Sequence, residues 1–96
     1  MISEPVFAFR LYVAGDGQNS VRAIANLTAL CEARLAGRHR IEVVDVFGDP
    51  ARALADHIVM TPTLMRVEPA PIRRVVGTLQ ASDDVVAALG LAGAAA

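Results

Sequence analysis

Met60-Thr61-Pro62-Thr63-Leu64 is the stretch of this 96-residue sequence that decides its predicted fold, because a proline stands where an apolar strand should begin. Proline at the first residue of a strand removes no hydrogen bond that the sheet needs. The Thr61–Pro62 bond is a tertiary amide, so its cis form costs only about 0.5–1 kcal/mol, against roughly 3 kcal/mol at an ordinary peptide bond. We therefore interpret Pro62 as a corner ahead of a strand, with both the cis and the trans isomer left open.

The chain before this corner predicts a strand and then a long helix. Apolar side chains alternate over residues 6–13, the period-two pattern of a strand with one buried face. From about residue 18 to residue 36 they recur at three- and four-residue steps, which is typical of an amphipathic helix. Asp16 or Asn19 could provide its N-cap. The stripe expected to face the core consists of Val21, Ile24, Leu27, Cys31 and Leu35.

A second strand and a short helix should follow. Residues 41–46 predict a strand parallel to the first one, because a long helix connects the two. Asp49-Pro50 suits the start of a helix over residues 51–57, with Asp49 as the cap and proline at the first helical position. We expect Leu54 and Ile58 to face inward from this helix.

Three further elements complete the prediction. Residues 63–67 and 72–76 indicate two strands that pair antiparallel. Ser82 should cap a last helix that ends at Gly90. The order is therefore β-α-β-α-β-β-α, which predicts an α/β fold with a mixed four-stranded sheet and a single domain over residues 1–96.

Composition excludes several classes of protein. Hydrophobic residues make up 54% of the chain, which excludes disorder, and no apolar run reaches the roughly 18 residues of a membrane span. The net charge of −1 argues against nucleic-acid binding through bulk positive charge. Cys31 is the single cysteine and the N-terminal residues lack a signal-peptide pattern, so we expect a cytoplasmic protein.

The motifs that would support catalysis or cofactor binding are incomplete. Gly15-Asp16-Gly17-Gln18-Asn19-Ser20 imitates a dinucleotide-binding loop, but serine replaces its third glycine and Asp16 puts a negative charge where pyrophosphate would lie. The same loop contains no cysteine, so it cannot supply the thiolate of disulfide exchange. His39 and His57 lack further ligands at metal-binding spacing. We therefore expect no catalytic residue, cofactor or metal.

Arginines are the candidate binding residues, because all nine basic residues of the chain are arginine. Adjacent residues of a strand point to opposite faces, so Arg73 and Arg74 cannot both face the core. Two interpretations remain open: a solvated sheet face, or a surface of arginine forks that meets an acidic partner. The arginines concerned are Arg10, Arg22, Arg66, Arg73 and Arg74.

Two resemblances follow from these segments. Thr61-Pro62 followed by a strand is similar to the cis-proline corner of thioredoxin-like domains. The whole series, from about Phe7 to Leu91, resembles the KaiB family of circadian clock proteins in its order and nearly in its spacing. The matching segments are Leu11-Tyr12-Val13-Ala14-Gly15, Asn19-Ser20-Val21-Arg22-Ala23, Val43-Val44-Asp45-Val46, Asp49-Pro50, Thr61-Pro62-Thr63-Leu64 and Pro71-Ile72-Arg73-Arg74-Val75-Val76-Gly77.

The resemblance to KaiB implies a non-enzymatic protein that binds KaiC, a hexameric RecA-like ATPase with autokinase and autophosphatase activity. A KaiA-like protein and a histidine kinase with a KaiB-like sensor domain are the further partners it implies. It also implies two folds, a thioredoxin-like form that binds the ATPase and a rearranged form with a swapped second half. Such switching requires two packings within a few kcal/mol of each other. A homodimer and a homotetramer are both compatible with this resemblance.

The resemblance places the partner contacts around residues 50–60. The candidate binding residues are Arg22, Ala53, Asp56, His57, Arg73 and Arg74, with Thr61 and Pro62 in a structural role. His57 stands where cyanobacterial members commonly carry lysine. Ala88 and Gly90 replace a glycine and an aspartate of the last helix, and alanine favours a helix over glycine by about 0.8–1 kcal/mol. We therefore expect the thioredoxin-like form to be preferred.

Two departures leave alternatives to a circadian role. Asp16-Gly17-Gln18 replaces the Asn-Thr-Pro that cyanobacterial members usually carry, and the acidic tail of many clock members is missing. A KaiC-like partner in a simpler timing or stress circuit is one alternative. The other is a thioredoxin-fold protein that binds thiols or glutathione without a C-x-x-C motif.

Overall fold

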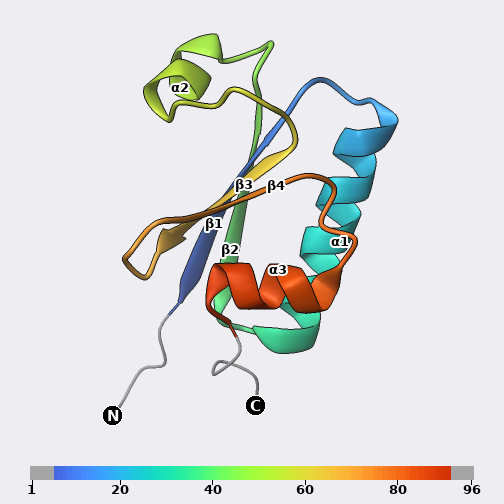
Figure 1. The fold of residues 1–96 in the computed structure, drawn as a ribbon, viewed down its shortest axis with the longest axis vertical. Coiled ribbons are helices and arrows are strands. Elements are labelled where there is room, and N and C mark those ends of the chain that lie inside the picture. The colour runs from blue at the N-terminus through green and yellow to red at the C-terminus, as the bar shows by residue number, and fades with distance from the viewer. Residues whose placement is uncertain (1–5, 92–96) are drawn as a thin grey trace.

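In the computed structural model, which describes residues 6–91, three helices pack around a four-stranded sheet (Figure 1). The order of the elements is the predicted one, β-α-β-α-β-β-α. The elements are β1 (Phe7–Val13), α1 (Gln18–Arg34), β2 (His39–Asp45), α2 (Pro50–Ala55), β3 (Thr63–Glu68), β4 (Arg73–Val76) and α3 (Ser82–Leu89). The tail after Leu91 lies outside the described residues, as do residues 1–5.

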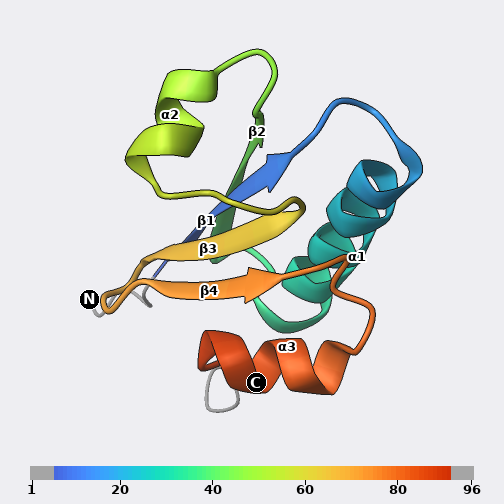
Figure 2. The same cartoon turned by 45° about the horizontal axis from the view of Figure 1, so that its top comes forward.

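The sheet is mixed, with the strand order β2-β1-β3-β4. β1 pairs parallel with β2, while β3 pairs antiparallel with both β1 and β4. Figure 2 shows α2 on one side of the sheet and α3 on the other, with α1 on the same side as α3. The predicted parallel and antiparallel pairings are therefore confirmed.

Two apolar clusters lie on the two sides of the sheet, because the residues of β1 alternate as predicted. Phe7, Phe9, Leu11 and Val13 enter the larger cluster with α1 and α3. Tyr12 points to the other side, into a smaller cluster beneath α2 that also contains Val44, Ala53 and Met65. The side of the sheet that α2 covers thus has far less apolar packing than the side that α1 and α3 cover.

The predicted inward face of α1 is wrong at its start. Val21 is 58% exposed, whereas Ser20 is buried. The hydroxyl group of Ser20 donates a hydrogen bond to the carbonyl oxygen of Ala14, with 3.3 Å between the two oxygens. Each helical residue is rotated by about 100° from the one before, so anchoring Ser20 beside the end of β1 turns Val21 toward solvent. The N-cap is Gly17, so neither Asp16 nor Asn19 caps the helix.

The short helices differ from prediction in similar ways. Asp49 caps α2 as expected and accepts a hydrogen bond from the backbone N–H of Arg52. Ala53 faces the sheet instead of Leu54, which is 78% exposed, because a helix of six residues has room for little more than one inward position. In α3 the N-cap is Ala81 rather than Ser82, and Gly90 ends the helix with a φ of 70° as predicted.

Arg66 fits neither interpretation of the arginine set. Its side chain lies inside the fold and is only 5% exposed. One guanidinium nitrogen donates to the carbonyl oxygen of Leu89 and the other to that of Pro71, both at 2.7 Å. Burial, with the nearby charge of Arg73, lowers the pKa of Arg66. Arg66 therefore joins β3 to the end of α3 and to the turn before β4.

Candidate docking surface

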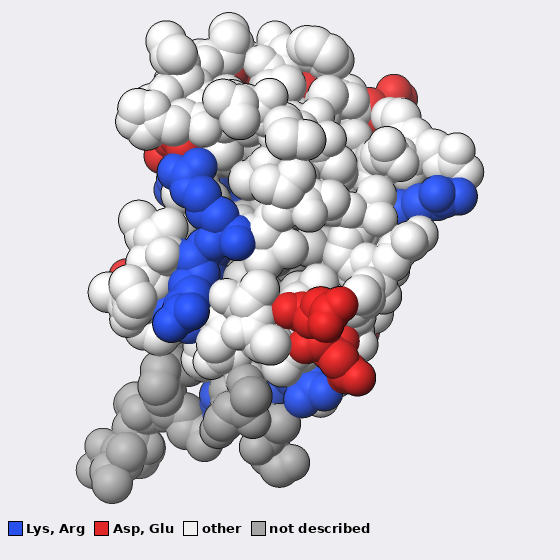
Figure 3. Space-filling view, viewed as in Figure 1, with Lys and Arg blue, Asp and Glu red and all other residues white. Residues whose placement is uncertain are grey.

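Four large apolar side chains are exposed on α2 and on the two connections that flank it. Their exposed fractions are 75% for Phe47, 78% for Leu54, 90% for Val59 and 59% for Met60. Figure 3 shows that this end of the molecule is largely uncharged. We call these four residues the α2 apolar group. Clustered exposure of large apolar side chains commonly marks a site of protein–protein contact.

Basic side chains lie near this end. Figure 3 shows a basic band over the β3–β4 side of the molecule, and acidic side chains over α3. Arg73 and Arg74 are both exposed on β4 but turn to opposite faces, as predicted: Arg74 donates to the carbonyl oxygen of Asp56, while Arg73 lies beside Gly90. Arg22 is exposed on α1. Arg74 therefore belongs to the α2 side of the sheet and Arg73 to the α3 side.

Asp56 connects α2 to the sheet. Tyr12, which is fully buried, donates its hydroxyl hydrogen to Asp56 Oδ2, and Arg10 Nη1 donates to the same oxygen at 2.9 Å. The Tyr12 hydrogen bond and the Arg10 charge lower the pKa of Asp56, although partial burial opposes them. Burial and the Asp56 carboxylate raise the pKa of Tyr12. Asp56 is thus an anion at neutral pH and Tyr12 a neutral donor.

A second set of ion pairs holds α2 against β2. Arg52 donates to both oxygens of Glu42, at 2.6 and 2.8 Å, and Arg10 Nε donates to Glu42 Oε1 at 3.2 Å. These hydrogen bonds lower the pKa of Glu42 to about 2. The Glu42 side chain is 49% exposed, so water screens this pairing and its contribution to stability is modest.

The candidate residues named from the sequence fall into three groups. Arg22, His57, Arg73 and Arg74 are exposed and accessible to a partner. Ala53 is buried on the inner face of α2, and Asp56 turns its carboxylate inward. Sequence reasoning placed partner contacts around residues 50–60 but did not identify the apolar group, since Leu54 was assigned inward and Phe47, Val59 and Met60 were not named as contact residues. The available signal was their position in short connections, where no periodicity assigns them to the core.

The Pro62 corner lies opposite the start of α1. The Thr61–Pro62 bond is cis, as are the bonds before Pro69 and Pro71. Thr61 and Pro62 line a shallow hollow of about 300 Å³ together with residues 17–20, none of which is a cysteine. Cys31 is fully buried elsewhere, and burial raises its pKa to about 12. The hollow therefore contains no thiolate for redox chemistry.

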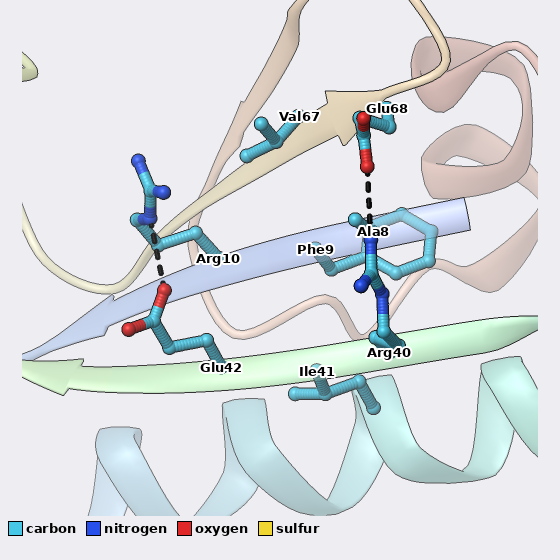
Figure 4. A pocket seen from close by; sticks show the side chains of 8 residues that line it. All are labelled: Ala8, Phe9, Arg10, Arg40, Ile41, Glu42, Val67 and Glu68. Carbon is cyan, nitrogen blue, oxygen red and sulfur yellow. Dashed lines mark hydrogen bonds and ion pairs between the residues drawn. The ribbon is translucent and has the colours of Figure 1, made fainter. Parts of the chain in front are cut away.

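A groove also crosses the part of the sheet that α2 leaves uncovered (Figure 4). It has a volume of about 310 Å³ and is lined by apolar side chains and two ion pairs. Arg40 reaches across Ala8 to Glu68 at 2.9 Å, and Arg10 pairs with Glu42. Because these charges already neutralise one another, the groove offers a charged ligand no unpaired counter-charge.

Residues 6–91 contain neither a metal-ligand cluster nor a helix suited to span a membrane. No three or more His, Cys, Asp or Glu side chains in this range come together in a way that could hold a metal ion. No helix in the same range is both long and apolar enough to cross a membrane.

These features define a class, a thioredoxin-like domain without the thiol pair of a disulfide reductase. Chloroplastic thioredoxin z superposes with a TM-score of 0.70 and 18% identity, covering 91% of this chain and 80% of that one. Mitochondrial thioredoxin 3 from Saccharomyces cerevisiae superposes with a TM-score of 0.69 and 16% identity, covering 92% of this chain and 78% of that one. The N-terminal domain of SasA from Synechococcus elongatus superposes with a TM-score of 0.65 and 20% identity, covering 94% of this chain and 89% of that one. At these identities the likeness shows the fold alone.

Sequence relatives identify the family within that class. The family model of the KaiB domain matches residues 10–91. The circadian clock oscillator protein KaiB of Synechococcus elongatus is 38% identical over 91 residues, covering 95% of this chain and 89% of the relative. KaiB of Thermosynechococcus vestitus is 40% identical over 85 residues, covering 88% and 79%. The chain belongs to the KaiB family, which confirms the resemblance stated above.

Proposed function

We propose that this chain is a non-enzymatic regulator that binds a KaiC-like hexameric ATPase through α2 and its flanking connections. The observation that carries the proposal is the α2 apolar group, with Val59 90% exposed at its edge. An isolated domain gains nothing from leaving four large apolar side chains in water, whereas a partner that covers them releases that water. Membership of the KaiB family supports the choice of partner.

Exposed basic side chains elsewhere on the molecule suit an acidic rim on the partner. Arg22 and Arg74 are exposed on α1 and β4, and His57 is exposed at the end of α2. Arginine forks pair well with carboxylates, and charges at the rim of an interface contribute mainly to specificity and association rate. Apolar contacts would therefore supply most of the affinity, and the arginines would select the partner and its orientation.

Other parts of the proposal rest on the family alone. A KaiA-like protein and a histidine kinase are proposed as further partners, and a dimer or tetramer as an additional state of the free chain. A cytoplasmic location belongs to the same proposal. A timing circuit simpler than the circadian clock is retained as the alternative setting.

The test uses the purified chain and a KaiC-type hexamer from the same genome, with ATP present. Binding is measured by size-exclusion chromatography and by pull-down. Leu54→Asp and Val59→Asp should abolish the complex, because both put a charge into the apolar contact. Ile72→Asp is the matched control, since Ile72 is also exposed, at 56%, but lies in the turn between β3 and β4. Equal binding by all three variants would move the interface elsewhere.

Arg22→Glu tests the role of the basic side chains with less risk to the fold than Arg74→Glu. Arg74→Glu should also weaken the complex, but Arg74 donates to the Asp56 carbonyl and its loss would disturb α2 as well. Arg22 has the advantage that its side chain is exposed on α1 and takes no part in the hydrogen bonds of Asp56 described above. We expect Arg22→Glu to slow association and to reduce its dependence on salt concentration. An association rate equal to that of wild type would place Arg22 outside the interface.

The alternative function, binding of thiols or glutathione, has its own test. It would use the hollow beside Thr61 and Pro62, where no cysteine is present. We expect no reduction of insulin disulfides and no retention on immobilised glutathione. Turnover of a dithiol substrate would overturn the proposed function.

A further inference from the structure

We propose that Asp56 and Tyr12 are positioning residues that hold α2 and residues 57–60 in the conformation that the partner binds, without touching the partner themselves. The inference rests on the proposed function, because it assumes that the α2 apolar group is the docking surface. It assigns Asp56, first named as a contact residue, a different role.

Apolar contacts anchor α2 only weakly. This helix has six residues, and Ala53 is the one that it buries. Alanine offers little apolar area, and a helix this short is not stable by itself in water. Leu54, its largest apolar side chain, points to solvent. The orientation of α2 must therefore depend on polar contacts.

Asp56 provides such contacts in two directions. Its carboxylate accepts hydrogen bonds from Tyr12 and Arg10 on β1, and its carbonyl oxygen accepts one from Arg74 Nη2 on β4 at 2.6 Å. It is also the C-cap of α2, where its N–H donates to the carbonyl oxygen of Arg52. One residue thus connects the end of α2 to two strands of the sheet.

The exposed segment begins directly after this anchor. His57 has a φ of 57°, a left-handed conformation that turns the chain out of the helix. The backbone N–H of Ile58 then donates a hydrogen bond to the carbonyl oxygen of Ala53 at 2.9 Å. Val59 and Met60 follow, and both are exposed. Loss of the anchor would let this segment occupy other conformations, and the apparent affinity falls in proportion to the fraction that remains competent to bind.

Tyr12 separates positioning from direct contact. It is fully buried, so a docked partner cannot touch it, yet its hydroxyl group is hydrogen-bonded to the Asp56 carboxylate and also lies 3.2 Å from the carbonyl oxygen of Arg52 on α2. Tyr12→Phe removes that hydroxyl and leaves the ring in place. An effect of Tyr12→Phe on partner affinity must therefore act through Asp56 and α2.

The experiment measures the affinity of full-length variants for the KaiC-type hexamer, together with hydrogen exchange of the amides of residues 53–60. Tyr12→Phe and Asp56→Asn should each weaken binding, by about tenfold for the loss of one charge-assisted hydrogen bond. The double variant should lose clearly less affinity than the product of the two single effects, because both substitutions remove the same hydrogen bond and only the Tyr12 contact with the Arg52 carbonyl oxygen is additional. Amide exchange should accelerate in residues 53–60 of both variants. Glu68→Gln is the control, because it removes a carboxylate from an ion pair at the opposite end of the sheet and should change neither quantity.

If Tyr12→Phe binds like wild type while Asp56→Asn does not, Asp56 touches the partner and the inference is wrong. Unchanged exchange in Tyr12→Phe would also overturn it, whether or not the hexamer binds. If wild type itself fails to bind, the proposed function has failed and the inference, which rests on it, falls as well.

Discussion

Replacing Arg66 by methionine should destabilise the fold strongly, although Arg66 lies far from the proposed docking surface. Methionine keeps the apolar stem of the side chain and removes the guanidinium group. The carbonyl oxygens of Leu89 and Pro71 then lose the donors that lie 2.7 Å from them. Leu89 is the last residue of α3, where helix carbonyls lack partners within the helix, so this donor also satisfies the negative end of the helix.

The expected magnitude follows from these contacts. Hydrogen bonds to a charged group contribute about 1.5–3 kcal/mol each, which gives a gross loss of roughly 3–6 kcal/mol for two. Removing the guanidinium group also has a favourable effect, which offsets part of this loss. In the wild type the charge is buried and Arg66 Nε has no hydrogen-bond partner among the described residues, and the substitution ends both costs. A net loss of about 2–3 kcal/mol remains. In a domain of this size that lowers Tm by about 10–20 °C.

The assay is thermal and urea unfolding followed by circular dichroism. Arg40→Met is the matched control, since it makes the same chemical change at a side chain that is 69% exposed and paired with Glu68. The control should stay within about 0.5 kcal/mol of wild type. A Tm of Arg66→Met within a few degrees of wild type, or an equal loss in Arg40→Met, would refute the reasoning.

Three further predictions follow from single side chains. Gly90→Ala should lower Tm by about 5–10 °C in calorimetry, because φ is 70° and the new Cβ would lie 3.1 Å from Arg66 Nη1; an unchanged Tm would contradict this. Arg52 and Arg10 lower the pKa of Glu42 to about 2, whereas its pKa in the unfolded chain is about 4.3. The Glu42 carboxylate therefore stabilises the fold fully at pH values above about 4.3 and loses this effect as the pH falls toward 2. The Tm deficit of Glu42→Gln should therefore be present at neutral pH and shrink as pH falls from about 4.5 toward 2, and a constant deficit would argue against the pairing. Cys31, with its pKa raised to about 12 by burial, should not react with a thiol reagent near pH 8 until guanidinium chloride unfolds the chain.

The regular elements could be predicted because each shows a full hydrophobic repeat. The alternation of β1 over seven residues assigned Phe7 and Tyr12 to opposite faces correctly. A helix of six residues contains too little of a repeat to orient it, and Leu54 was therefore assigned inward wrongly. Arg66 was missed for another reason: alternation places it on the same face as buried Leu64, but its polarity suggested exposure.

The candidate surface was predictable only in part. Alternation correctly separated Arg73 from Arg74, and the segment around α2 was correctly expected to present exposed residues such as His57. The inward turn of Asp56 was not predictable, because its partner Tyr12 lies 44 residues away in sequence. Contacts of that separation leave no local pattern in the sequence.

The affinity of Val59→Ala for the KaiC-type hexamer tests the central claim most directly. Val59 is 90% exposed, so its truncation should leave Tm unchanged. Removal of two buried methyl groups from a docked interface costs about 1.6 kcal/mol, which corresponds to an affinity roughly 15-fold weaker. A loss of that size with Tm unchanged is the predicted result. No binding by wild type, or equal binding by Val59→Ala and wild type, would contradict a docking surface on α2.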